Sequence, residues 1–140
     1  MKKLVLLLSL GLVGCSSAII TNSEPLKNPN EVKHVCVKQG KAEYFAKALS
    51  ESLNKRNIST EIYKTDPQPS CKYLLAYSLA DRNGLAVRAK VRLSIKNGES
   101  LVSLGEVSYK QRGEEKERAA RTGVQGQTDL MISELFKNHK

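Results

Sequence analysis

The strongest constraint on the fold is a strict alternation of apolar and polar residues between positions 85 and 96. Every second residue from Leu85 to Ile95 is apolar, and four of the six residues that alternate with them, from position 86 to 96, are cationic. These cations are Arg88, Lys90, Arg92 and Lys96. A period of two is that of a β-strand with one face on the core and the other in water. The pairs Asn83-Gly84 and Asn97-Gly98 favour tight hairpins on both sides. The segment therefore predicts the middle strand of an antiparallel meander.

Strand patterns also occur before and after this segment. Residues 71–80 and 100–110 are rich in aliphatic and aromatic side chains and complete the meander. In the second of these strands the apolar phase shifts across Gly105, which indicates a β-bulge. Shorter strands are predicted at 33–37 and 59–64. We therefore expect a mainly antiparallel sheet of about five strands.

Two segments have helical periodicity. In residues 42–55, one apolar stripe is formed by Phe45, Leu49 and Leu53. A second stripe runs from Val124 to Phe136 and predicts a C-terminal helix. The stretch 111–118 contains Glu114, Glu115 and Glu117 among cations, and we expect a solvated loop there. The predicted order is β-α-β-β-β-β-α, an α+β two-layer sandwich with both helices on one face of the sheet.

The beginning of the chain has the features of an export signal. Lys2-Lys3 precede an apolar run from Leu4 to Val13, which is too short to span a membrane. Gly14-Cys15 follow, and the segment resembles a bacterial lipoprotein signal with its lipobox. The resemblance implies that Cys15 becomes the lipid-modified first residue of the mature protein. The residue after this cysteine is Ser16, and in this respect the chain resembles lipoproteins that Gram-negative bacteria sort to the outer membrane. An uncleaved anchor and an ordinary secretory signal are the alternatives.

This interpretation divides the chain into three parts. Residues 1–14 are the signal peptide, and residues 15–32 are the lipidated cysteine with a flexible tether rich in Ser, Asn and Pro. Residues 33–140 form one domain, expected in the periplasm and anchored to the outer membrane through the lipid.

Two cysteines remain once Cys15 is assigned to lipid. In an exported protein, Cys36 and Cys71 favour a disulfide. The alternatives are two buried thiols, a thiol–imidazole pair of Cys36 with His34, or a metal site formed by these three residues. A metal site needs more ligands than the three supply. We therefore expect the disulfide and neither a metal ion nor a cofactor.

The charge narrows the class of ligand. The chain has 23 Lys and Arg against 14 Asp and Glu, a net charge of +9. The export signal argues against nucleic acid and favours anionic lipids, lipopolysaccharide or peptidoglycan. The four cations at 88–96 would form a ridge that follows phosphates or an acidic partner, or else a merely solvated face. The sequence has no glycine-rich phosphate loop and no paired catalytic carboxylates, so we do not expect an enzyme.

The chain resembles a group of small proteobacterial outer-membrane lipoproteins of uncharacterised role. The resemblance rests on Cys15, Val35 to Val37, Leu53-Asn54-Lys55-Arg56, Cys71, Asn97-Gly98 and the segment from Asp129 to Phe136. At the level of fold it is also similar to the curli-secretion channel subunit and to lipoprotein activators of peptidoglycan synthases, whose long insertions it lacks. The resemblance implies a non-catalytic lipoprotein that binds a protein partner or supports an envelope complex. Binding of an anionic envelope ligand through the basic sheet face is the alternative.

Overall fold

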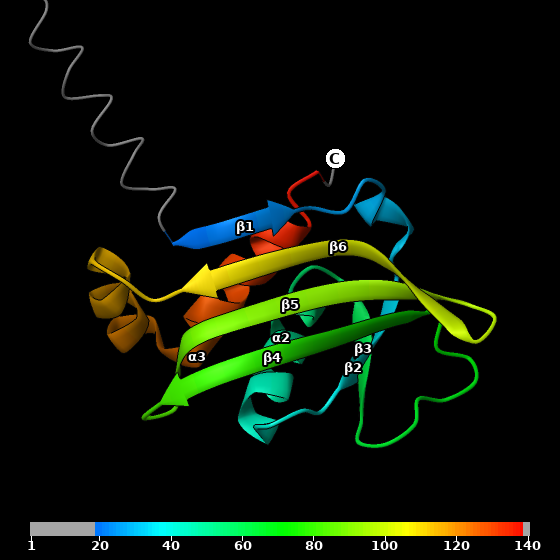
Figure 1. Cartoon of the computed structure of the whole chain (residues 1–140), viewed down its shortest axis with the longest axis horizontal. Helices are drawn as coiled ribbons and strands as arrows, with labels where there is room; N and C mark the ends of the chain where they lie inside the picture. The colour runs from blue at the N-terminus through cyan, green and yellow to red at the C-terminus, as the bar shows by residue number, and fades with distance from the viewer. Residues whose placement is uncertain (1–18, 139–140) are drawn as a thin grey trace, which may run out of the picture.

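The alternating segment forms β5, which lies inside a six-stranded sheet in the computed structural model of residues 19–138 (Figure 1). Two helices pack on one face of this sheet, and the other face is open. The elements are β1 (Ile20–Glu24), a short 3-10 helix (Pro29–Glu31), β2 (His34–Lys38), α2 (Glu43–Asn54), β3 (Ser59–Tyr63), β4 (Tyr73–Arg82), β5 (Leu85–Asn97), β6 (Ser100–Lys110) and α3 (Glu114–Leu135). The predicted α+β class is confirmed.

The sheet is mixed, with the strand order β1-β6-β5-β4-β2-β3. β4, β5 and β6 form the predicted antiparallel meander, and β1 pairs antiparallel with β6. β2 is parallel to both β3 and β4. Helix α2 connects β2 to β3 and returns the chain to the end from which β2 started, so these two strands run in the same direction.

The expected flexible tether is wrong from residue 20 onward. β1 forms within it, and two apolar residues that follow, Leu26 and Val32, are buried. The backbone N–H of Leu26 donates to the carbonyl of Leu135 at 2.9 Å, which joins this segment to the end of α3. β1 lacks an apolar alternation because it is an edge strand held by backbone pairing. The signal peptide and Cys15 lie outside the described residues.

Two β-bulges change which residues face the core. The first bulge lies in β5. Arg88 pairs with Ala80 and Ala86 pairs with Asp81, so Val87 has no partner in β4 and is the extra residue. Ala86, predicted on the polar face, is therefore completely buried. The second bulge lies in β6 beside Gly105, as predicted, with Leu104 as the extra residue.

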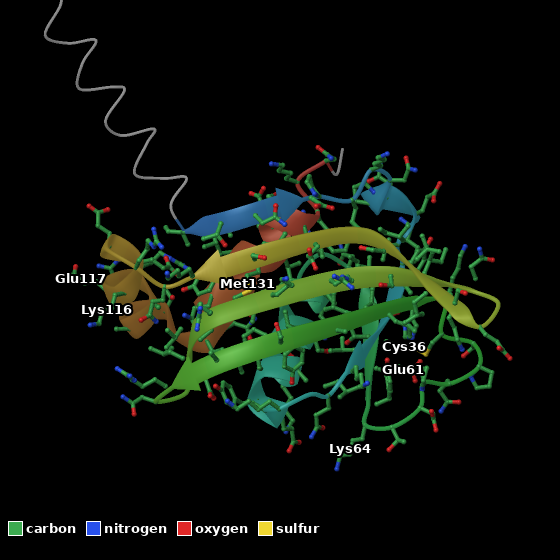
Figure 2. All side chains as sticks on the ribbon, viewed as in Figure 1. Cys36, Glu61, Lys64, Lys116, Glu117 and Met131 are labelled. Carbon is green, nitrogen blue, oxygen red and sulfur yellow. A yellow bond between two sulfur atoms is a disulfide. The ribbon has the colours of Figure 1, made fainter. Side chains whose placement is uncertain are left out.

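The helices provide the second layer. The apolar stripe predicted in α2 is buried against the sheet. Among the described residues, no helix is long and apolar enough to cross a membrane. The solvated loop predicted at 111–118 is wrong, because α3 begins at Glu114. Lys116 and Glu117 lie on its surface beyond the end of the sheet, whereas Met131 lies beneath the strands (Figure 2). Gly123, with φ 74°, kinks the helix between these two parts.

Candidate functional site

The open face of the sheet carries the predicted cations. Helices α2 and α3 lie behind the sheet in Figure 1, so alternate side chains of β4, β5 and β6 face solvent on the near side. All four predicted cations are exposed, and they are Arg88, Lys90, Arg92 and Lys96. Their exposure confirms the side of β5 on which they lie, but the structure does not place them together in one site.

Arg88 and Lys90 line a shallow groove of about 380 Å³. Lys110 of β6 lies directly opposite Arg88 and adds a third cation that the sequence did not indicate. Ser78 and Ser108 add hydroxyl groups from the strands on either side. Cationic groups, small neighbours and hydroxyl donors on one surface are the groups that recognise a phosphate. The groove is therefore the candidate ligand site.

The other two predicted cations lie elsewhere on β5. The guanidinium of Arg92 donates two hydrogen bonds to Glu106 Oε1, at 2.8 Å from Nη2 and 3.1 Å from Nε. The carboxylate already neutralises Arg92. Lys96 pairs with Leu101 near the β5–β6 turn, at the far end of the strand from the groove. The predicted ridge therefore divides into three parts: Arg88 and Lys90 line the groove, Arg92 is paired with Glu106, and Lys96 lies at the other end of β5.

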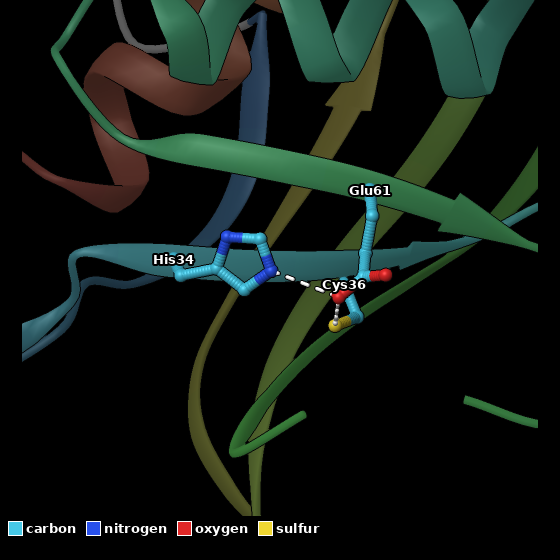
Figure 3. Close-up of side chains that lie close together, drawn as sticks. All are labelled: His34, Cys36 and Glu61. Atoms are coloured by element: carbon cyan, nitrogen blue, oxygen red, sulfur yellow. Dashed lines mark hydrogen bonds and ion pairs between the residues drawn. The ribbon is translucent and has the colours of Figure 1, made fainter. Parts of the chain in front are cut away.

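A second cluster surrounds the disulfide. Cys36 and Cys71 are bonded to each other as predicted, with their Cα atoms 6.0 Å apart, and both residues are buried. The alternatives of free thiols and of a Cys36–His34 catalytic pair are therefore contradicted. The parallel register of β2 and β3 places Glu61 opposite Cys36. Figure 3 shows the ring of His34 and the sulfur of Cys36 both directed toward one carboxylate oxygen of Glu61.

One carboxylate oxygen is shared within this cluster. Glu61 Oε1 lies 3.0 Å from His34 Nε2, 3.2 Å from Cys36 Sγ and 3.4 Å from Cys71 Sγ. The other ring nitrogen of His34, Nδ1, lies 2.6 Å from the hydroxyl of Ser59. The sequence did not single out Glu61, because its proximity to Cys36 depends on the pairing of two strands separated by a helix.

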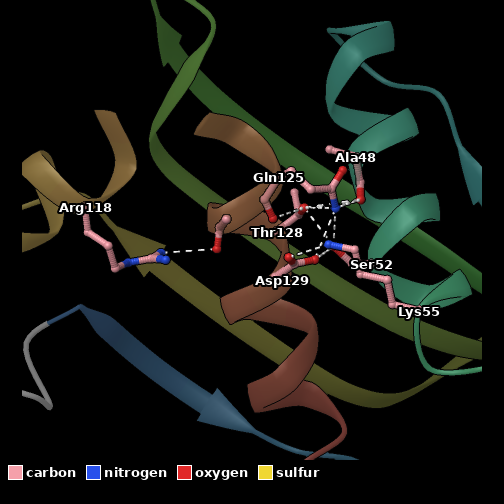
Figure 4. A network of polar contacts seen from close by, with 8 residues as sticks. Ala48, Ser52, Lys55, Arg118, Gln125, Thr128 and Asp129 are labelled. Atoms are coloured by element: carbon pink, nitrogen blue, oxygen red, sulfur yellow. Dashed lines mark hydrogen bonds and ion pairs between the residues drawn. The ribbon is translucent and has the colours of Figure 1, made fainter. Parts of the chain in front are cut away.

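A polar network joins α2 to α3 (Figure 4). Gln125 donates to the carbonyl of Ala48 at 3.0 Å and to Asp129 at 3.1 Å, while Lys55 donates to Asp129 at 2.8 Å. Partial burial raises the pKa of Asp129. Hydrogen bonds from Lys55, Ser52 and Gln125 outweigh this effect and leave the pKa below its usual value. The network fixes the packing of the two helices.

Glu115 is buried and neutralised inside the protein. Arg118 donates to its carboxylate at 2.6 and 2.8 Å, and the hydroxyl of Tyr109 donates at 2.5 Å. Burial, together with the bond to Glu115, raises the pKa of Tyr109 far above its usual range. Gln127 completes the network by bonding both backbone groups of Ala86, at 2.9 Å each. These contacts hold α3 against the bulge of β5 and indicate a structural role.

Comparison with solved structures gives a distant structural likeness. No family model and no curated protein matches the sequence. The fold is similar to a crystal structure of a minor lipoprotein from Acinetobacter baumannii, with 14% sequence identity and a TM-score of 0.38, over 77% of this chain and 95% of that chain. A likeness at this level carries no inference about ligand or partner.

Proposed function

We propose that this protein is a lipid-anchored, non-catalytic lipoprotein of the bacterial envelope whose open sheet face binds phosphate groups of anionic envelope lipids. The observation that supports the proposal best is the groove with Arg88, Lys90 and Lys110. The three cations surround small side chains and hydroxyls, so a phosphate can approach the sheet closely. None of the three forms a salt bridge within the described residues, which leaves their charge for a ligand.

The position of the groove relative to the lipidation site supports lipid as the ligand. The backbone N–H of Lys110 donates to the carbonyl of Ile19 at 2.9 Å, so the chain enters the sheet beside the groove. Cys15 precedes Ile19 by four residues, which span at most about 14 Å when extended. A lipid on Cys15 would therefore hold the groove near the bilayer surface. Each Lys or Arg close to an anionic surface contributes about 1 kcal/mol to binding.

The anchor has a direct test. Cells that express the full chain are labelled with a radioactive fatty acid and separated into soluble, inner-membrane and outer-membrane fractions. We expect label on the protein and recovery with the outer membrane. The Cys15→Ser variant should carry no label. Equal labelling of the variant would contradict lipidation at Cys15, and recovery with the inner membrane would contradict the proposed destination.

The groove is tested with vesicles and the unlipidated Cys15→Ser protein. We expect binding to vesicles of anionic phospholipid to fall at least tenfold in Arg88→Ser/Lys90→Ser/Lys110→Ser, and to weaken with added salt. A matched variant, Lys33→Ser/Lys47→Ser/Lys64→Ser, loses the same charge away from the groove. Equal losses in the two variants would show that net charge alone drives binding and would contradict the groove. Parallel assays with lipopolysaccharide identify which envelope phosphate is preferred.

Docking of a protein partner is a second candidate. Leu101 and Val102, at the turn between β5 and β6, are 58% and 45% exposed. Exposed aliphatic side chains on a hairpin are typical of contact surfaces between proteins. A photo-crosslinking residue at position 101 in cells should form one discrete adduct that is absent when the residue is at position 51 of α2. Adducts of equal intensity at both positions would argue against docking at the hairpin.

A further inference from the structure

We propose that Cys36, Cys71, His34 and Glu61 form a zinc-type metal site when the disulfide is reduced. The inference does not depend on lipid binding by the open face. The two sulfurs, one imidazole and one carboxylate are donors that Zn²⁺ accepts together in a four-coordinate site. Three ligands were too few for a metal site in the sequence, and Glu61 supplies the fourth.

Glu61 Oε1 already lies near the other three donor atoms, close to the spacing that such a site requires. Bonds from zinc to sulfur, nitrogen and oxygen of about 2.0–2.3 Å place tetrahedral donors roughly 3.3–3.8 Å apart. Glu61 Oε1 lies 3.0 Å from His34 Nε2, 3.2 Å from Cys36 Sγ and 3.4 Å from Cys71 Sγ. The donor atoms of His34, Cys36 and Glu61 all lie within 4.8 Å of one another. Two changes are required, and reduction permits both: the two sulfurs must separate, and Cys71 Sγ must move toward His34, because it lies outside the 4.8 Å group of the other three donors.

A neighbouring hydroxyl orients the histidine for this role. His34 Nδ1 lies 2.6 Å from Ser59 Oγ, and that hydroxyl donates to the carbonyl of Lys33 at 3.3 Å. A hydroxyl whose proton is engaged in this way accepts a hydrogen bond from Nδ1–H, which directs Nε2 toward the other donors. Metal-binding histidines are commonly held by such an outer hydrogen bond.

The chemistry balances with a dithiol reductant. The reductant transfers two electrons and two protons to the disulfide, which breaks the sulfur–sulfur bond and leaves two thiols, while the reductant closes its own disulfide. Binding of Zn²⁺ to both sulfurs then releases the two thiol protons, along with any proton on Nε2. A disulfide oxidant reverses the reduction: it accepts the two electrons from the thiolates, takes two protons from water to become a dithiol, and the re-formed bond between Cys36 and Cys71 releases Zn²⁺. The cluster therefore binds no metal when the two cysteines are oxidised and can bind Zn²⁺ when they are reduced.

Cobalt is the probe, because Co²⁺ in a tetrahedral thiolate site absorbs visible light. The detergent-solubilised full chain is reduced anaerobically with a phosphine and titrated with Co²⁺. We expect one equivalent to produce a thiolate-to-cobalt charge-transfer band and tetrahedral ligand-field bands, which Zn²⁺ then removes. The oxidised protein should produce neither. Absence of the bands after reduction, or their presence before it, would overturn the proposal.

Four single variants, one of them a control, test which side chains contribute to Co²⁺ binding. His34→Ala and Glu61→Gln should each weaken Co²⁺ binding by more than tenfold, and Ser59→Ala, which removes only the orienting hydroxyl, by about tenfold. Glu51→Gln changes an exposed carboxylate on α2 and should bind like the wild type. Circular dichroism of the same reduced samples establishes that each is folded. Unchanged affinity in both His34→Ala and Glu61→Gln would show that the thiolates act alone and would disprove the four-ligand site.

Discussion

Glu115 shows how a single buried charge is accommodated in this protein. Its side chain is completely buried and is neutralised by Arg118, while Tyr109 donates a further hydrogen bond. Replacing the carboxylate with an amide leaves Arg118 without its counter-charge in a partly buried position. We expect Glu115→Gln to lower the free energy of unfolding by about 2 kcal/mol, measured by urea denaturation.

Glu114 and Glu117 provide the matched control for this change. Both lie in the same first turn of α3 and are exposed. Their replacement by Gln removes the same charge without a buried partner, so each should change stability by less than about 0.5 kcal/mol. Three equal losses would show that charge at the start of α3, rather than the buried network, determines the stability.

Asp129 predicts a pH dependence of stability. Burial raises its pKa, but the hydrogen bonds from Lys55, Ser52 and Gln125 together outweigh this effect and hold the pKa below the ordinary value of an aspartate. An acid with a lowered pKa in the folded state stabilises the protein above its unfolded pKa. That contribution disappears as the pH falls through the folded pKa. The stability gap between the wild type and Asp129→Asn should therefore be largest near pH 6 and shrink below about pH 4. Urea midpoints at several pH values measure this gap, and parallel curves would contradict the prediction.

The sequence identified some residues of the candidate sites and of the buried network, and missed others for a physical reason. Arg88 and Lys90 lie on one strand, so a period of two placed them on one face. Lys110 and Glu61 come near their partners only through strand pairing across a hairpin or a helix, which one sequence does not determine. Glu115 was missed because the residues next to it in the sequence are charged, which is typical of an exposed segment. Its burial depends on the contact with Tyr109 of β6, which the sequence does not reveal.

At the scale of elements, the kink of α3 depends on one glycine. Gly123 has φ 74° and ψ −173°, a conformation that side chains of L residues strongly disfavour. A Cβ atom added there meets no heavy atom within 4 Å, so a substitution tests the backbone conformation alone. We expect Gly123→Ala to cost about 1–3 kcal/mol in urea denaturation. Arg121→Ala, a change of an exposed residue two positions before Gly123 and within the helical backbone, should cost less than about 0.5 kcal/mol. A neutral Gly123→Ala would mean that the helix can straighten at no cost.

The elements that the sequence predicted best are those with strong internal periodicity. β5 and α2 each bury one face, and the spacing of their apolar residues in the sequence reflects which face is buried. β1 has no such pattern because its backbone pairs with β6 at the sheet edge while most of its side chains stay partly or fully exposed. The first part of α3 was assigned to a loop because its surface is charged nearly all round and one of its two buried residues, Glu115, is itself charged, so no apolar stripe is visible.

For the whole molecule, β1 brings the domain closer to the proposed anchor at Cys15. The expected tether was long enough to hold the domain away from the membrane. Because the chain is instead paired from Ile20 onward, Cys15 precedes the sheet by only five positions, and the proposed groove would lie close to any lipid on that residue. The disulfide lies in another part of the sheet, where β2 meets β3 and the start of β4. Lipid binding and the proposed metal site can therefore be varied separately.

The disulfide also gives a prediction for the stability of the whole domain. It connects residues 35 positions apart, and closing a loop of that length in the unfolded chain is worth about 4 kcal/mol in the chain-entropy model. Reduction of the wild type in the presence of a metal chelator should lower the free energy of unfolding by about this amount, measured in urea. The Cys36→Ser/Cys71→Ser variant should show the same loss and no further response to the reductant. Zinc added to the reduced wild type should restore part of the stability, because a ligand that binds only the folded state stabilises it. The serine variant, which has no thiolates there, should recover none. Equal recovery in both proteins would place zinc elsewhere, and a loss below about 1 kcal/mol on reduction would contradict the entropic role of the crosslink.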